Sequence, residues 1–190
     1  LLLKQINCEL HTGAVLQIRG ANGSGKSTLL RILAGLIEPH DGAILWQDQS
    51  IFSNRDSYQQ QLHYIGHKNA LKHTLTVFEN LQLCSTLAKS KPRHQRIEEI
   101  SAQVGLHKFM QTEARHLSAG QLRRLALARL LLYPAALWIL DEPATALDQD
   151  GQNLLISLLN QHPGIAIVAT HQPLILTKNI QTILLGEHNA

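Results

Sequence analysis

The sequence predicts an α/β fold with a core of parallel strands, a small antiparallel β part and a lobe built from helices. Short apolar runs bounded by turn residues lie at Leu137 to Leu140 and at Ile165 to Ala169, as expected of strands that are buried on both faces of a parallel sheet. Another apolar run, Val15 to Ile18, leads directly into a glycine-rich loop. From Leu75 to Leu132 the apolar residues follow a helical period.

The bulk properties are those of an ordinary globular chain. Of its 190 residues, 44% are hydrophobic and 16% are charged. No run approaches the roughly 18 consecutive apolar residues that a membrane-spanning helix needs. A net charge of +3 on scattered lysines and arginines gives no reason to expect nucleic-acid binding. Two cysteines, Cys8 and Cys84, without a secretory signal favour free thiols in the cytoplasm.

The other elements are predicted from turn residues and periodicity. Two strands are expected between Leu3 and Ile18, around a turn at Thr12 and Gly13. A helix is expected from Thr28 to Gly35. The remaining expected elements are short strands at Ala43 to Trp46 and Leu62 to Ile65, which a glutamine-rich connection separates, and a crossover helix at Gln152 to Leu159.

The glycine-rich loop matches the phosphate-binding P-loop pattern and stands between a predicted strand and a predicted helix. Its residues are Gly20, Ala21, Asn22, Gly23, Ser24, Gly25, Lys26, Ser27 and Thr28. Glycines let backbone N–H groups turn inward around phosphate oxygens at the positive end of a helix. Lys26 is expected on the β- and γ-phosphates, Ser27 on Mg²⁺, and Thr28 near the α-phosphate. An ordinary glycine turn is the weaker alternative, because Lys26 and Ser27 stand where the chemistry needs them.

Two carboxylates end the strand that begins at Ala136. Asp141 and Glu142 are predicted at the carboxyl edge of the sheet, where the P-loop also opens. We expect Asp141 to hold Mg²⁺ and Glu142 to polarise the water that attacks the γ-phosphate. His171 follows the next apolar strand and is expected to contact the γ-phosphate and that water. The alternative is a turn cap at Asp141 and an exposed Glu142, which a complete P-loop disfavours.

A further motif, Leu117 to Gln121, reads leucine, serine, alanine, glycine, glutamine. It resembles the signature of ATP-binding-cassette (ABC) subunits, and Ala144 to Asp148 resembles their D-loop. The resemblance covers nearly the whole chain. It implies one ABC ATPase domain over residues 1–190, with a RecA-like core in about 1–71 and 133–190 and a helical lobe in about 72–132.

The same resemblance implies a head-to-tail dimer that closes on ATP and Mg²⁺. In such a dimer, Ser118 and Gly120 of one copy contact the γ-phosphate held by the other, and Gln121 and Asp148 are also expected among the nucleotide-binding residues. Ser118 is also a suitable cap for the helix that follows it. Binding would close the dimer, and loss of the γ-phosphate would reopen it.

Two positions depart from the family pattern. His67 stands where the family has the glutamine of its Q-loop. His67 either replaces that residue at the metal through a ring nitrogen, or only lies in the coupling cleft, and the sequence does not separate the two. The aromatic residue on which the family stacks adenine has no candidate before Gly20, and we expect it upstream of Leu1.

Within the family, four segments are most similar to the ATPase of the bacterial haem exporter used in cytochrome c maturation. They are Tyr64 to His67, Leu75 to Leu81, Leu117 to Arg129 and Leu137 to Pro143. This implies an ATP-hydrolysing transport subunit at the cytoplasmic face of the inner membrane, bound to integral membrane permease subunits. The alternatives are an ABC exporter for another cargo, a soluble ABC ATPase that acts on DNA or ribosomes, and a nucleotide-binding module without catalysis. No spacing of histidine and cysteine supports a haem ligand in this chain.

Overall fold

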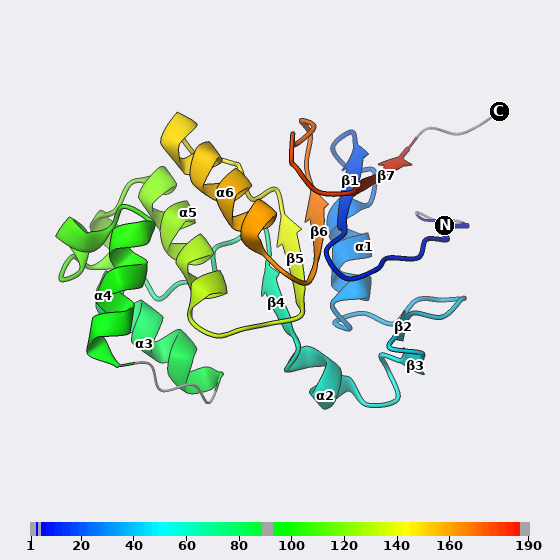
Figure 1. Ribbon diagram of the computed structural model, residues 1–190, viewed down its shortest axis with the longest axis horizontal. Helices are drawn as coiled ribbons and strands as arrows, with labels where there is room; N and C mark the ends of the chain where they lie inside the picture. The colour runs from blue at the N-terminus through cyan, green and yellow to red at the C-terminus, as the bar shows by residue number, and fades with distance from the viewer. Residues whose placement is uncertain (1–2, 4, 89–92, 187–190) are drawn as a thin grey trace. The chain divides into compact units, whose positions relative to one another are not determined.

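The computed structural model describes residues 3, 5–88 and 93–186 (Figure 1). The chain divides into two compact units. Residues 1–67, 135–142 and 159–190 form the first unit, and residues 68–134 and 143–158 form the second.

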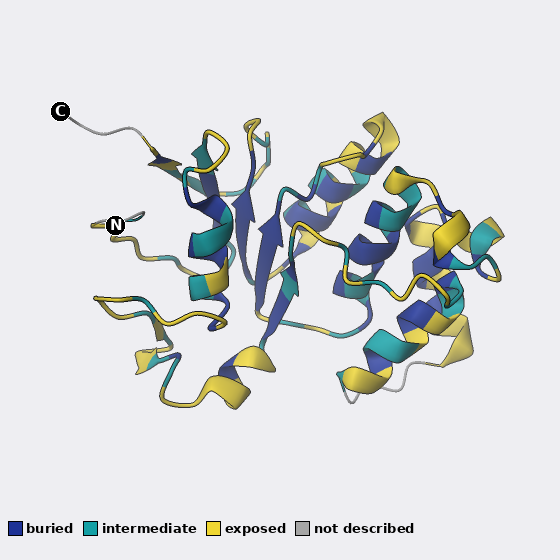
Figure 2. Ribbon diagram, turned by 180° about the vertical axis from the view of Figure 1, so that it is seen from behind, coloured by how far each residue is buried: buried dark blue, intermediate teal, exposed yellow. Residues whose placement is uncertain are grey.

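The first unit is built on a five-stranded parallel sheet. In spatial order its strands are β4 (Leu62–Ile65), β5 (Leu137–Asp141), β6 (Ile165–Ala169), β1 (Val15–Gly20) and β7 (Ile180–Leu185). Every residue of β5 and β6 is buried, and both strands are dark blue in Figure 2. The predicted parallel core is therefore confirmed.

One helix, α1 (Lys26–Leu33), packs against β5 and β6 of this sheet. Its Leu29 and Leu30 share a buried cluster with Ile18, Ile139 and Ile167. The helix begins two residues before the predicted start. The reason is local: Gly25 has a φ of 99°, a left-handed conformation that glycine adopts easily, and the helix starts at the next residue.

The glutamine-rich connection holds more structure than the sequence indicated. Strands β2 (Leu45–Trp46) and β3 (Gln49–Ser50) pair antiparallel and form the expected small β part. Helix α2 (Arg55–Gln59) follows, and the side chain of Asn54 caps it by accepting from the N–H of Ser57. This helix was not predicted, because five mostly polar residues carry no helical period.

At the edges of the sheet, one prediction is wrong and one strand was not predicted. The described residues before Thr12 form no strand; Gln5 has a φ of 52°, outside the extended region, although Ile6 and Leu10 still pack against the core. The strand that was not predicted is β7. As an edge strand it is only partly buried, so its residues lack the uniform apolar pattern of the inner strands.

The second unit is helical; it includes residues 143–158 as well as the region of about 72–132 that was expected to form the helical lobe. It contains α3 (Val77–Leu87), α4 (His94–Gln103) and α5 (Ala119–Ala128), joined by the 3-10 turns His107–Phe109, Ala114–His116 and Arg129–Leu131. Leu81, Ile100, Val104 and Leu125 are buried together at its centre. The predicted crossover helix is α6 (Gln149–Gln161), which is longer at both ends than expected.

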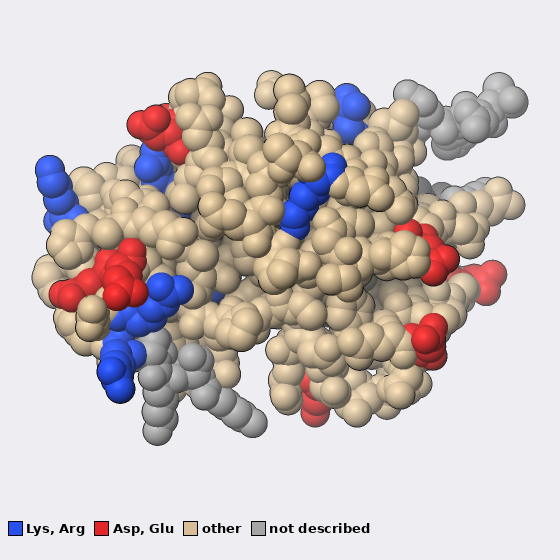
Figure 3. All heavy atoms as spheres, in the orientation of Figure 1, with Lys and Arg blue, Asp and Glu red and all other residues tan. Residues whose placement is uncertain are grey.

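The surface carries mixed charge. On the face in Figure 3, lysine and arginine side chains lie in separate small groups, some of them beside acidic residues. Within the described residues, no helix is long and apolar enough to cross a membrane. Cys8 and Cys84 are free thiols.

A stacked aromatic pair lies near the amino ends of β5 and β6. The rings of Trp138 and His162 are 3.9 Å apart at an interplanar angle of 13°, and both side chains are buried. Nε2 of His162 lies 3.3 Å from the carbonyl oxygen of Ile165, which can only accept a hydrogen bond. Burial, with a smaller contribution from the Lys178 and His63 charges, lowers the pKa of His162 to about 4.

This shift makes the stability of the chain depend on pH. An unfolded histidine has a pKa of about 6.5. Between this pH and pH 4, His162 binds a proton in the unfolded state but stays neutral in the folded state. The contribution of His162 to the free energy of unfolding should be nearly constant above about pH 6.5 and should fall by on the order of 3 kcal/mol as the pH drops to 4. His162→Gln should flatten this fall in urea titrations followed by tryptophan fluorescence. The exposed His107→Gln should not, and equal slopes for the two variants would contradict the assignment.

Candidate functional site

The P-loop connects β1 to α1 and wraps around its own lysine. Lys26 is 7% exposed, and its ammonium donates to the carbonyl oxygens of Gly20 at 2.8 Å and Ala21 at 3.0 Å. No side chain caps α1, so the first N–H groups of the helix face the loop with the positive end of its dipole. The sequence folds in this way because Gly20, Gly23 and Gly25 all have positive φ angles.

Asp141, at the end of β5, and Glu142, directly after it, differ in backbone conformation. Asp141 is the last residue of the strand and is 1% exposed. Glu142 has a φ of 48°, and its N–H donates to the carbonyl oxygen of Ala169 at 2.9 Å. A left-handed conformation at a residue with a Cβ costs on the order of 1–3 kcal/mol, and such strain is concentrated at functional sites. The turn aims the Glu142 side chain back toward the P-loop.

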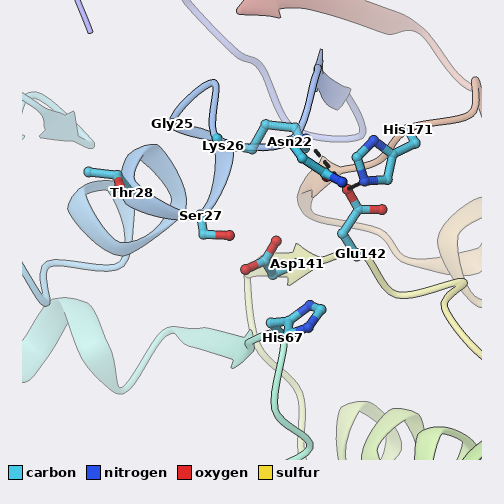
Figure 4. A pocket seen from close by; sticks show the side chains of 10 residues that line it. Asn22, Gly25, Lys26, Ser27, Thr28, His67, Asp141, Glu142 and His171 are labelled. Carbon is cyan, nitrogen blue, oxygen red and sulfur yellow. Dashed lines mark ion pairs between the residues drawn. The ribbon is translucent and has the colours of Figure 1, made fainter. Parts of the chain in front are cut away.

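Glu142 lies between two basic side chains from different segments. Its Oε1 is 3.8 Å from Nζ of Lys26 and 3.1 Å from Nε2 of His171, as the dashed lines in Figure 4 show. Only 14% of the Glu142 side chain is exposed, against 47% of His171. The carboxylate is thus held near the P-loop lysine, while the imidazole remains open to solvent on one side.

These groups line a cavity of about 350 Å³. Its lining residues are Asn22, Gly23, Gly25, Lys26, Ser27, Thr28, His67, Asp141, Glu142 and His171. All ten belong to the first unit, and nine are labelled in Figure 4. A cavity of this size lies within the range of small-molecule sites.

The oxygens of Ser27 and Asp141 face each other across this cavity (Figure 4). A hydroxyl and a carboxylate are oxygen donors of the kind that Mg²⁺ prefers, so the residues present fit a magnesium ion. His67 follows β4, is exposed, and lies beside Asp141 in the same view. Among the described residues, no group of three or more histidine, cysteine or acidic side chains could hold a metal by itself.

The signature residues lie in the second unit, at the start of α5. Ser118 is exposed and caps the helix, as predicted: its Oγ accepts from the N–H of Gln121 at 3.2 Å, and its own N–H donates to the Gln121 side chain at 2.8 Å. Gly120 is partly exposed, and a Cβ there would come within 2.9 Å of the carbonyl oxygen of Ala146. The amino end of α5 is therefore accessible at Ser118 and partly accessible at Gly120, which adds no side chain there.

The D-loop carboxylate has a partner that the sequence analysis missed. Oδ1 of Asp148 lies 2.5 Å from Nη2 of Arg124, three residues past the signature. The hydrogen bond from Arg124, with a smaller contribution from the N–H of Gly151, lowers the pKa of Asp148. Two consecutive arginines after the signature were the signal available in the sequence.

Fold and site together define a P-loop ATPase of the ABC class. A comparison with protein families agrees: residues 3–145 match the model described as "ABC transporter". Among solved structures, an ABC transporter ATP-binding protein from Pyrococcus furiosus superposes with a TM-score of 0.80 at 25% identity, over 90% of this chain and 84% of that one. A dimeric ATP-binding cassette in a post-hydrolysis state, bound to ADP and Pi, gives a TM-score of 0.77 at 26% identity, over 90% and 80%.

Comparison with individual relatives assigns the chain to a narrower group within this class. It is 43% identical over 191 residues to a protein of Vibrio cholerae, which covers 98% of this chain and 92% of the relative. It is 44% identical over 193 residues to a protein of Escherichia coli K12, which covers 100% and 91%. Both are named "cytochrome c biogenesis ATP-binding export protein CcmA". The chain therefore belongs to the ABC transporter family, and within it to the family of these export proteins. It is an ATPase that binds ATP and ADP.

Gly20 lies very close to the backbone of a neighbouring strand, and this close contact can be tested by mutation. A Cβ there would lie 2.4 Å from the carbonyl oxygen of Leu185, on the neighbouring strand β7. Gly20→Ala should lower the free energy of unfolding by about 3 kcal/mol or more, because backbone must move. At Gly23, also at positive φ, a Cβ would meet no described heavy atom within 4 Å, so Gly23→Ala should cost only about 1–2 kcal/mol. Equal losses in urea titrations would contradict this packing.

Proposed function

We propose that this chain is the ATP-hydrolysing subunit of the haem export complex of cytochrome c biogenesis. Residues 1–190 act as one ABC domain, with a RecA-like core and a helical lobe. It works at the cytoplasmic face of the inner membrane, bound to integral membrane permease subunits. The names of the relatives and the sequence resemblance to the haem exporter ATPase support the cargo and the location. The observation that carries the ATPase activity is the placement of Glu142 between Lys26 and His171.

The P-loop binds the triphosphate of ATP. Backbone N–H groups from Gly20 to Thr28 surround the phosphates, and Lys26 binds the β- and γ-phosphates. Charged phosphate oxygens are stronger acceptors than the two neutral carbonyls that hold Lys26 in this structure. When Lys26 turns to the phosphates, it moves away from Glu142 and leaves that carboxylate free to act on water.

Glu142 acts as the general base. It takes a proton from the water that attacks the γ-phosphate, and its left-handed backbone fixes the direction of the carboxylate. His171, 3.1 Å from the same carboxylate, orients the water and contacts the γ-phosphate. Ser27 and Asp141 would hold Mg²⁺, which when bound neutralises charge on the β- and γ-phosphates. His67, at the Q-loop position, either completes the metal site through a ring nitrogen or links the pocket to the permease.

Hydrolysis takes place in a head-to-tail dimer. The exposed amino end of α5 in one copy, with Ser118, Gly120 and Gln121, binds the γ-phosphate held by the P-loop of the other, and Asp148 lies near the same junction. The solved dimer of a similar cassette with ADP and Pi supports this assembly. Binding closes the dimer and hydrolysis reopens it, which passes movement to the permease.

The role of Glu142 is tested by Glu142→Gln. This change keeps the size of the side chain and removes the base, so ATP binding should be retained while turnover falls by about 10² to 10⁴. Phosphate release and binding of a fluorescent ATP analogue measure the two effects separately. Glu99→Gln, an exposed glutamate on α4, is the matched control. Near-normal turnover by Glu142→Gln would refute the base.

The shared site is tested by mixing two inactive variants. Lys26→Ala disables the P-loop, and Ser118→Arg places a bulky cation over the exposed amino end of α5. In a 1:1 mixture, half of the dimers hold one copy of each variant, and each of these has one intact site. About a quarter of the wild-type number of sites should then return. Hydrolysis that stays absent in the mixture, while both variants fold and dimerise, would mean that each copy forms its site alone.

A further inference from the structure

A buried arginine in the second unit joins three functional segments. Arg123 lies on α5, two residues after the signature, and is only 3% exposed. Its Nε donates to the carbonyl oxygen of Pro143 at 3.1 Å, and its Nη1 donates to Oδ1 of Asn69 at 2.9 Å. A buried charge is costly to desolvate and is weak evidence for stability alone. The positions of its hydrogen-bond partners in the chain indicate a different role.

Both partners stand where the chain enters the second unit. The chain leaves the first unit after His67 and again after Glu142, so Asn69 and Pro143 are the second and the first residue past these two passages. The last residue before each passage, His67 or Glu142, lines the nucleotide cavity. Arg123 thus holds the two segments that continue directly from two cavity residues.

The first passage is held at a second point from the same part of the chain. Nη1 of Arg129, directly after α5, donates to the main-chain carbonyl oxygen of Asn69 at 3.2 Å. The next residue, Ala70, has a φ of 51°, which an alanine adopts only when its surroundings hold it there. Glu142, at the other passage, has a φ of 48°. Two strained backbones therefore adjoin the groups that Arg123 holds.

We infer that Arg123 is a positioning residue that couples the signature helix to Glu142 and His67 through these two passages. This inference rests on the proposed function. The guanidinium is a rigid planar fork, so the hydrogen bonds to Asn69 and Pro143 keep both residues in a fixed relation to α5. When α5 shifts on meeting the nucleotide of a second copy, both passages shift with it. The general base is thereby set in place when the composite site closes.

Arg123→Lys separates this role from general stability. Lysine keeps the charge and most of the length, but it offers one compact donor in place of the fork. With the complete protein in its membrane complex, kcat for ATP should fall by about 10- to 100-fold, the effect of a small displacement of catalytic groups. KM for ATP should stay within about twofold, because the P-loop itself is unchanged. Asn69→Ala should lower kcat less, and the double variant should be no worse than Arg123→Lys alone.

Asn80→Ala is the matched control. Asn80 is 2% exposed in the same unit; its amide donates to the carbonyl oxygens of Lys72, Leu75 and Thr76, and its Oδ1 accepts from the N–H of Lys72. None of these bonds reaches a passage residue. Asn80→Ala should lower Tm and leave kcat per folded protein unchanged.

The outcomes separate the inference from the function. If wild type hydrolyses ATP but Arg123→Lys keeps the kcat of Asn80→Ala, Arg123 is only structural and the inference is overturned. If Arg123→Lys does not fold, Asn69→Ala decides, and a kcat equal to wild type overturns the inference. If wild type in its complex hydrolyses no ATP, the proposed function itself fails.

Discussion

The site depends on the hydrogen-bonded register of three parallel strands. Ile18 of β1 and Asp141 of β5 both lie beside Ala169, the last residue of β6. The ladder continues one step past the strands, where the N–H of Glu142 binds the carbonyl oxygen of Ala169 and the N–H of Thr170 binds that of Ile18. Because parallel strands end at one edge, the P-loop, the acidic pair and His171 leave the sheet together. A slip of one residue would turn each side chain to the opposite face.

Within that edge, electrostatics orders the site. The ammonium of Lys26 and the imidazole of His171 both lie close to Oε1 of the Glu142 carboxylate, and the three side chains come from three different segments. Lys26 is also held by two main-chain carbonyl oxygens of its own loop, those of Gly20 and Ala21. The left-handed backbone at Glu142 is held by the bond to Ala169 and by the rigid sheet behind it. The backbone strain is therefore located at Glu142, and the buried sheet holds this residue in its strained conformation.

The residues of interest are distributed over both units. The first unit holds all the lining residues of the cavity at the P-loop, and the second holds the signature at the start of α5. The chain passes between them beside residues of the cavity, and arginines on and after α5 hold the segments that follow.

The sequence by itself determined the parts that local chemistry specifies. The glycine-rich loop before α1, the buried apolar runs of β5 and β6, the Ser118 cap and the carboxylates at a strand end follow from residue type and spacing, and the structure places each of them where it was predicted. Only the tertiary structure decided the rest. Edge strand β7 and the segment before Thr12 depend on whether a neighbouring strand is present, which periodicity does not report. The bonds of Arg123 and Arg124 join residues 20 or more positions apart, so folding alone selects those partners.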